Sequence, residues 1–226
     1  MADRAAAFFD VDNTLVRGET LFSFVRYCLP AVGRSTDELD ETIARMRRLR
    51  EAGTPRLQTN RLFYTILAGI PAGPVAVLAE QWWEELCASP RTFHEPVCAN
   101  LREHAAANLM IVLVSGSFPA CLAPIARYFG AHQVICTEPI IEADHYTGDV
   151  TTAMIGSNKA VAVSQVLHRH NLSSRDSFAY GDHSSDIDFM SLVGNPVAVA
   201  PTDQQLASHA ATHNWPTIGY KETQWA

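Results

Sequence analysis

Two aspartates follow the first apolar segment of the chain at a spacing that lets them act together. Residues 5–9 are apolar and predict a buried strand, and Asp10 and Asp12 come directly after it. Because side chains alternate along an extended chain, the two carboxylates share one face there. Such a pair suits a hard cation and nucleophilic chemistry. With Asn13 and Thr14, the same residues also fit an Asp-rich turn, so this segment leaves both interpretations open.

Three later segments place polar residues just after an apolar run or at the start of a helical pattern. They are Ser115-Gly116-Ser117, Ser157-Asn158-Lys159, and the stretch from Gly181 to Asp186, which contains Asp182. Ligands of parallel α/β sheets bind where the carboxyl ends of the strands meet, so these segments should converge with the first one. Carboxylates, a hydroxyl, a lysine and backbone N–H groups together describe a Mg²⁺-assisted phosphate site.

Each of these segments has a purely structural alternative. Ser115 fits a helix N-cap, and Lys159 fits a surface position. Asp182 and Asp186 fit a turn and a helix cap. The occurrence of all the segments in this order, each at the end of a strand or the start of a helix, favours the site.

The elements that must position these residues form two blocks. Between the first and second strands, apolar spacing predicts helices at 19–29, 36–51, 55–68, 74–87 and 95–107. Beyond them the pattern alternates, with strands at 109–114, 133–136, 177–180, 196–200 and 217–218, helices at 118–129, 157–170, 184–192 and 203–212, and a hairpin over 140–150. This predicts an α/β fold, a Rossmann-like doubly wound and mostly parallel sheet with an inserted helical cap. We expect a core of residues 1–17 and 90–226 and a cap of residues 18–89.

Composition limits the classes of partner. The 226 residues are 47% hydrophobic and carry a formal net charge of -7, so nucleic acid is not an expected partner. The five cysteines include no C-x-x-C pair and fit reduced thiols, and we find neither a signal core nor an apolar stretch of membrane-spanning length. We therefore expect a soluble cytoplasmic protein with no membrane partner, and we leave its oligomeric state open. The basic run is interpreted as a solvated helix face among acidic residues; its members are Arg45, Arg47, Arg48 and Arg50.

Taken together, the motifs resemble those of the haloacid dehalogenase-like (HAD) superfamily. The matching set is D-x-D-x-T from Asp10, S-G-S from Ser115, Lys159, and G-D-x-x-x-D from Gly181. Segments 112–118, 146–150 and 179–182 are similar to the phosphoserine-phosphatase-like branch, subfamily IB, whose members carry a helical C1 cap. The resemblance implies a Mg²⁺-dependent phosphatase that hydrolyses a phosphomonoester of a small soluble metabolite through an aspartyl-phosphate intermediate. A phosphotransferase or mutase and an inactive binding protein on the same fold are the alternatives.

The resemblance also implies a role for each matching residue. Asp10 matches the nucleophile and Asp12 the general acid and base. Lys159 would neutralise the phosphate and Asp10, while Ser115 and the N–H of Gly116 would bind phosphoryl oxygens. The implied Mg²⁺ ligands are Asp10, the backbone carbonyl of Asp12, Asp182 and, directly or by orienting another ligand, Asp186.

The predicted cap holds the candidates for substrate selectivity. Glu19 stands where the branch often has a glutamate that binds a substrate amino group, and it equally fits an acidic residue in the first turn of a helix. Phe63 occupies the register of the branch's cap arginine for a substrate carboxylate, with Arg61 nearby. Further candidates, either for substrate contact or for the cap's own core, are Tyr64, Trp82 and Trp83.

Overall fold

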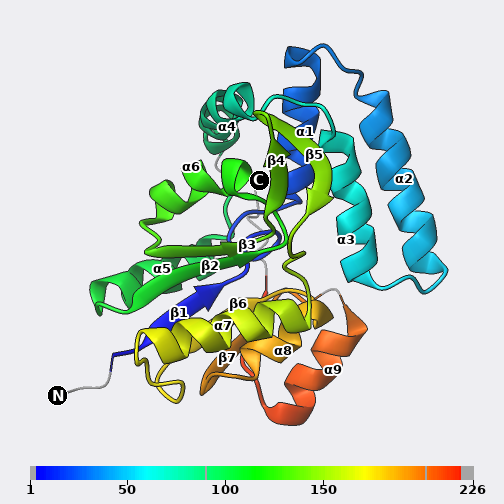
Figure 1. Ribbon diagram of the computed structural model, residues 1–226. Coiled ribbons are helices and arrows are strands. Elements are labelled where there is room, and N and C mark those ends of the chain that lie inside the picture. The colour runs from blue at the N-terminus through cyan, green and yellow to red at the C-terminus, as the bar shows by residue number, and fades with distance from the viewer. Residues whose placement is uncertain (1–3, 90, 202, 220–226) are drawn as a thin grey trace, which may run out of the picture.

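A six-stranded parallel sheet runs through the centre of the molecule. The computed structural model describes residues 4–89, 91–201 and 203–219 (Figure 1). The strand order is β3-β2-β1-β6-β7-β8, and all neighbouring strands are parallel, which confirms the predicted fold class. The strands are β1 (Ala6–Phe9), β2 (Met110–Ser115), β3 (Gln133–Cys136), β6 (Phe178–Gly181), β7 (Asn195–Val199) and β8 (Thr217–Ile218), and a separate antiparallel hairpin is formed by β4 (Pro139–Glu142) and β5 (His145–Val150).

Both faces of the sheet are covered, which explains why its strands are continuous apolar runs rather than alternating ones. Helices α5 and α6 cover one face of the sheet, and α7 and α8 cover the other (Figure 1). Phe9 and Leu113 belong to the buried cluster on the first face, whereas Phe8 and Val112 belong to the cluster on the second. All four side chains are fully buried. These helices are α5 (Glu95–Ala106), α6 (Pro119–Phe129), α7 (Ser157–Arg169) and α8 (Ile187–Met190), with α9 (Gln204–His213) against β7.

The register of the central strands brings their carboxyl ends together. Phe9 of β1 pairs with Leu113 of β2 on one side and with Tyr180 of β6 on the other. One residue further, the N–H of Asp10 donates to the carbonyl of Tyr180 at 2.9 Å. The residues that follow β1, β2 and β6 therefore meet at a single edge of the sheet.

The helical segment between β1 and β2 lies over this edge together with the hairpin (Figure 1). The predicted helix over 55–68 is shorter than expected, because the α-helical part ends at Tyr64 and a 3₁₀ turn follows. The predicted helix over 184–192 likewise begins as a 3₁₀ turn, since the His183 ring caps the N–H of Ser185. The observed elements are α1 (Thr20–Ala31), α2 (Asp37–Glu51), α3 (Arg56–Tyr64), the 3₁₀ turns Thr65–Leu67 and Ser184–Asp186, and α4 (Ala72–Cys87).

Two of the contacts that join this helical segment to the rest of the protein lie at Phe118 and at the hairpin. The ring of Phe118, at the start of α6, lies 5.7 Å from that of Phe24 in α1, within one cluster of buried residues that extends from the sheet to the helices. At the other place, the N–H of Tyr146 in β5 donates to the carbonyl of Ile70 at 2.9 Å. The division into a core and a cap at residues 18–89 remains a prediction, and residues 1–3, 90, 202 and 220–226 of the predicted core lie outside the described ranges.

None of the helices in the described ranges combines the length and apolar character needed to cross a membrane.

The ring of Phe118, which follows β2 of the sheet, packs against rings of both the helical segment and the hairpin. It is 1% exposed, and its ring centroid lies 5.7–6.0 Å from those of Phe24, Tyr64 and Tyr146. Phe118→Ala should lower the free energy of unfolding by about 3–5 kcal/mol, measured by urea unfolding, because it leaves a cavity among packed rings. Val77→Ala, at a side chain that is 62% exposed, is the control and should change it by less than about 0.5 kcal/mol. A loss for Phe118→Ala no larger than the control would show that this contact does not hold the two parts together.

Candidate active site

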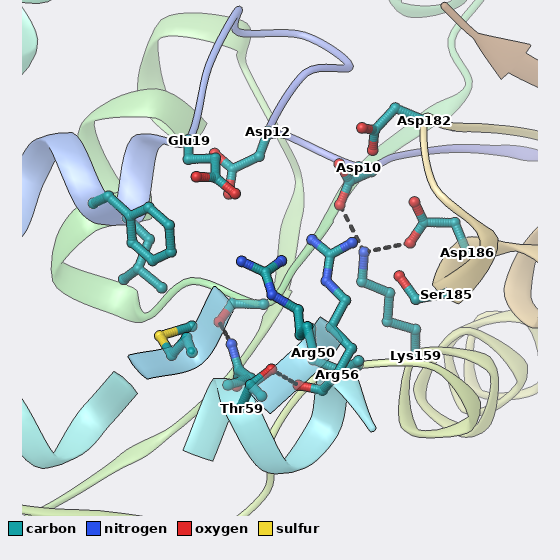
Figure 2. Close-up of a pocket in the computed structure, with 16 residues that line it drawn as sticks. Asp10, Asp12, Glu19, Arg50, Arg56, Thr59, Lys159, Asp182, Ser185 and Asp186 are labelled. Carbon is teal, nitrogen blue, oxygen red and sulfur yellow. Dashed lines mark hydrogen bonds and ion pairs between the residues drawn. The ribbon is translucent and has the colours of Figure 1, made fainter. Parts of the chain in front are cut away.

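Three carboxylates from separate elements meet at the carboxyl edge of the sheet. Asp10 follows β1, Asp182 follows β6, and Asp186 ends the 3₁₀ turn beyond it (Figure 2). One carboxylate oxygen from each lies within 4.8 Å of the other two. Asp10 and Asp186 are buried, whereas Asp182 is half-buried. The predicted convergence of the first and last motifs is therefore present in the structure.

Lys159 neutralises part of this negative charge. It lies in the first turn of α7, and its ammonium donates to Asp10 Oδ1 at 2.6 Å and to Asp186 Oδ1 at 2.7 Å. The side chain is 3% exposed. Burial opposes the charged form of Lys159, but the two carboxylates outweigh that effect and raise its pKa above the ordinary value. The ammonium therefore stays charged inside the protein.

One lysine does not balance three neighbouring carboxylates. Burial raises the pKa of Asp10 to about 7, assisted by the charges of Asp186 and Asp12 and opposed by Lys159. Burial likewise raises the pKa of Asp182 to about 8, assisted by Asp10 and Asp186. A cluster of carboxylate oxygens with surplus negative charge has the donor chemistry that a hard divalent cation such as Mg²⁺ requires. Asp10, Asp182 and Asp186 therefore fit such an ion.

The carboxylate of Asp12 is held apart from this cluster. Its Oδ1 accepts hydrogen bonds from the N–H of Thr20 at 2.7 Å and from Thr20 Oγ1 at 2.5 Å, at the start of α1. Burial raises the pKa of Asp12, and the bonds from Thr20 oppose that shift. Among the residues that the structure describes, the Asp12 side chain is not part of the three-carboxylate group. The role of its backbone carbonyl as a metal ligand stays a prediction.

The predicted phosphate-binding loop is closely packed. Gly116 lines the pocket, whereas Ser115 is buried and its Oγ accepts a hydrogen bond from the N–H of Ser117 at 3.0 Å. Ser115 is not a helix N-cap, because α6 begins at Pro119. A Cβ at Gly116 would lie 2.7 Å from Ile155 Cδ1, so a larger residue at this position would have to displace the end of the Ile155 side chain.

The carbonyl oxygen of Gly116 connects the loop after β2 to α3 through hydrogen bonds. It accepts hydrogen bonds from Asn60 Nδ2 at 3.1 Å and from Tyr64 Oη at 2.8 Å. Thr137 Oγ1, which follows β3, donates to the same oxygen at 3.0 Å. The helical segment is thus hydrogen-bonded directly to the loop that carries the second motif.

Two arginines that the sequence reasoning missed complete the pocket. Arg50 lies in the last turn of α2 and Arg56 begins α3, and both side chains extend toward the carboxylates (Figure 2). Arg50 is exposed, as the interpretation of the basic run as a solvated face expects, but it also lines the pocket. The helical spacing within α2 indicates that Arg50 lies on the side facing the rest of the protein, because the buried residues Leu39 and Met46 precede it on the same stripe.

The aromatic candidates of the cap do not line the pocket. Phe63 and Tyr64 are fully buried, and Trp82 and Trp83 are 3% and 6% exposed within the helical packing. They are packed as structural residues, and two of them also reach beyond the helical segment: the ring centroid of Tyr64 lies 6.0 Å from that of Phe118, and that of Trp83 lies 5.6 Å from that of Tyr128. Arg61 is exposed and does not line the pocket, so the structure does not bring it to the site. The residues that line the cap side of the pocket are Glu19, Leu21, Phe22, Met46, Arg50, Arg56, Thr59 and Asn60.

Of the cap residues that the sequence named as candidates for substrate contact, Glu19 is the one that lines the pocket. Its carboxylate lies beside that of Asp12 in Figure 2, although the residue is largely exposed. Partial removal from water raises the pKa of Glu19, and the Asp12 charge adds to the shift. Its place at the mouth allows contact with a bound molecule.

Comparison with known proteins places the chain in a family. Residues 7–191 match the family of haloacid dehalogenase-like hydrolases, and the chain belongs to this family. A probable phosphatase of Mycobacterium tuberculosis (strain H37Rv) is 25% identical, over 96% of this chain and 76% of that protein.

Solved structures agree on the fold. A Bordetella pertussis Tohama I protein of unknown function superposes with a TM-score of 0.83 at 24% identity, covering 96% of this chain and 99% of that one. A phosphoserine phosphatase in a phospho-aspartyl intermediate analogue form has a TM-score of 0.70 at 18% identity, covering 97% and 95%. These likenesses establish the fold, and with the family match they make the protein a hydrolase of the haloacid dehalogenase-like class.

The surplus carboxylates generate a prediction about stability. In EDTA, the native protein retains protons on Asp10 and Asp182 that the unfolded chain, with ordinary aspartate pKa values near 3.8, releases. Native stability should therefore fall as pH rises from about 4 to about 8, and Mg²⁺ should restore it at pH 8 by binding the native state. Thermal unfolding with EDTA or Mg²⁺ at several pH values measures both effects.

Two variants isolate the contribution of the cluster. Asp182→Asn removes one titrating group and one ligand, so both the pH slope in EDTA and the Mg²⁺ shift should shrink. Asp188→Asn changes an exposed aspartate of α8 and should behave like the parent. A parent protein whose unfolding temperature does not respond to Mg²⁺ at pH 8 would contradict the assigned cation site.

Proposed function

We propose that the protein is a Mg²⁺-dependent phosphatase that hydrolyses a phosphomonoester of a small soluble metabolite in the cytoplasm. The observation that carries the proposal is the separation of the two aspartates of the first motif. Asp10 is held by Lys159 within the three-carboxylate group, while Asp12 is held apart by Thr20 with a raised pKa. One carboxylate is thereby suited to attack and the other to carry a proton.

In the first half of the proposed reaction, Asp10 is the nucleophile. One of its carboxylate oxygens bonds to phosphorus as the bond between phosphorus and the ester oxygen breaks. Protonated Asp12 gives its proton to that ester oxygen, which leaves as an alcohol. Lys159 offsets the charge of Asp10 and of the phosphoryl group, and the N–H of Gly116 binds a phosphoryl oxygen.

In the second half, water removes the phosphoryl group from Asp10. Asp12, now a carboxylate, takes a proton from the water, whose oxygen bonds to phosphorus as the bond to Asp10 breaks. Inorganic phosphate leaves, and both aspartates return to their starting states. A Mg²⁺ ion held by Asp10, Asp182 and Asp186 would reduce the repulsion between the carboxylate and the phosphate.

The similar proteins support this chemistry. One relative is a probable phosphatase, and one structural neighbour is a phosphoserine phosphatase in a phospho-aspartyl intermediate analogue form. The cap positions that the resemblance named for a substrate carboxylate do not line the pocket, since Phe63 is buried and Arg61 is exposed. The proposal therefore names a phosphomonoester and does not name phosphoserine.

Two variants of the first motif should fail at different steps. With p-nitrophenyl phosphate and Mg²⁺, Asp10→Asn should release no phosphate, because an amide is a poor nucleophile. Asp12→Asn should still transfer the phosphoryl group, since p-nitrophenolate leaves without a proton, but hydrolysis should slow by about 10²–10⁴-fold. It should therefore release a burst of p-nitrophenolate equal to the enzyme present and gain the mass of one phosphoryl group.

The control is Asp188→Asn, which should match the parent in rate and show no burst. Turnover by Asp10→Asn within tenfold of the parent would rule out the covalent step. Asp12→Asn with a slow rate but no phosphoenzyme would contradict the division of roles between the two aspartates.

A further inference from the structure

One row of polar side chains on α3 faces the catalytic site. Arg56, Asn60 and Tyr64 are each four residues apart, a spacing that places them above one another on one face of a helix. Asn60 Nδ2 and Tyr64 Oη both donate to the carbonyl of Gly116, at 3.1 Å and 2.8 Å. The first member of the row, Arg56, lines the pocket beside them. The row therefore joins α3 to the loop after β2 through Asn60 and Tyr64, and it places Arg56 among the residues that line the pocket.

The guanidinium of Arg56 has no partner of its own. Within the described part of the chain it makes neither a hydrogen bond nor an ion pair, although the side chain is half-buried. In Figure 2 it extends toward Asp10 and Lys159, whereas that of Arg50 extends toward Glu19. Arg56 lines the same pocket as Asp10, Asp12 and Asp182, so it lies at the end of the pocket where the carboxylates meet.

The positive charge of Lys159 is already taken up by two carboxylates, so a second cation such as Arg56 is needed at a bound phosphoryl group. The ammonium of Lys159 is already shared between Asp10 and Asp186. Phosphoryl transfer spreads negative charge over three equatorial oxygens in the transition state, and fixed cations or N–H donors at those oxygens are the usual means of stabilising it. Arg56 offers several N–H donors in a fixed planar geometry.

We propose that Arg56 is a catalytic residue that α3 supplies to the transferring phosphoryl group. Asn60 and Tyr64, by binding the Gly116 carbonyl, set the depth at which α3 presents the guanidinium. The phosphoryl group is thus bound from the sheet by Lys159 and from the helical segment by Arg56. This inference rests on the proposed phosphatase activity.

The test compares substrates that differ only in their leaving groups. Arg56→Gln should lower kcat/KM by about 10²–10³-fold for p-nitrophenyl phosphate, phosphoserine and glycerol 3-phosphate alike, because the phosphoryl group is common to all three. Arg56→Lys should recover part of the loss. Orthovanadate, which resembles the phosphoryl group and has no leaving group, should bind Arg56→Gln about tenfold or more weakly than the parent.

Two variants on the same helix serve as comparisons. Arg61→Gln alters an exposed arginine of α3 outside the pocket and should stay within about twofold of the parent in every measurement. Tyr64→Phe removes one donor to the Gly116 carbonyl and should lower kcat for all substrates by a common factor smaller than that of Arg56→Gln, since Arg56 itself is retained.

The outcomes separate this inference from the proposed function. If the parent hydrolyses none of the substrates, or if Asp10→Asn is as active as the parent, the phosphatase proposal fails. If the parent is active but Arg56→Gln matches Arg61→Gln, Arg56 is not catalytic. A loss confined to phosphoserine would also overturn the inference, because it would assign Arg56 to the anionic leaving group instead of the phosphoryl group.

Discussion

The ammonium of Lys159 lies buried between the carboxylates of Asp10 and Asp186, and the arrangement of the site follows from that contact. Removing three charges from water is costly, so each must keep its partners in place. The contact joins the end of β1, the first turn of α7 and the 3₁₀ turn after β6. It requires β1 to lie beside β6, as the strand order provides. The surplus carboxylate, Asp182, then makes the same edge a site for an additional cation.

The sheet and the residues at its carboxyl edge could be predicted from the sequence, because each strand and the polar residues that follow it are neighbours along the chain. Each core strand is a short apolar run, and the motif residues that the strands position come directly after β1, β2 and β6, or in the first turn of α7. The rule that ligands bind at the carboxyl ends of parallel strands then brings Asp10, Asp182, Asp186 and Lys159 together without further knowledge. What was not predictable was the setting of Asp12, because its two hydrogen bonds come from Thr20, eight residues away at the start of α1.

The helical segment could be predicted only as a set of helices. Which face of α3 meets the site depends on how Phe63 packs against Phe22, and no local pattern specifies that contact. Arg61 was the natural choice beside Phe63. At 3.6 residues per turn, however, it lies about 140° around the helix from Arg56, and so it faces solvent when Arg56 faces the pocket. The resemblance therefore led to the helix that lines the pocket, α3, but the arginine chosen on it lies on a different side of that helix from the pocket.

The contacts of the helical segment also limit how it can move. α1 is tied to the site through Thr20 and Asp12 and to the core through Phe24. The chain after α3 is tied to the hairpin by the backbone bonds of Gly69 and Ile70 with Tyr146. Between these anchors, α2 and α3 reach the site only through their side chains, and Gly33 and Gly69, with φ of +76° and +77°, bound that stretch. Any movement of α3 away from the sheet must break the bonds of Asn60 and Tyr64 to Gly116, so the state of the loop after β2 and the position of α3 are coupled through one carbonyl oxygen.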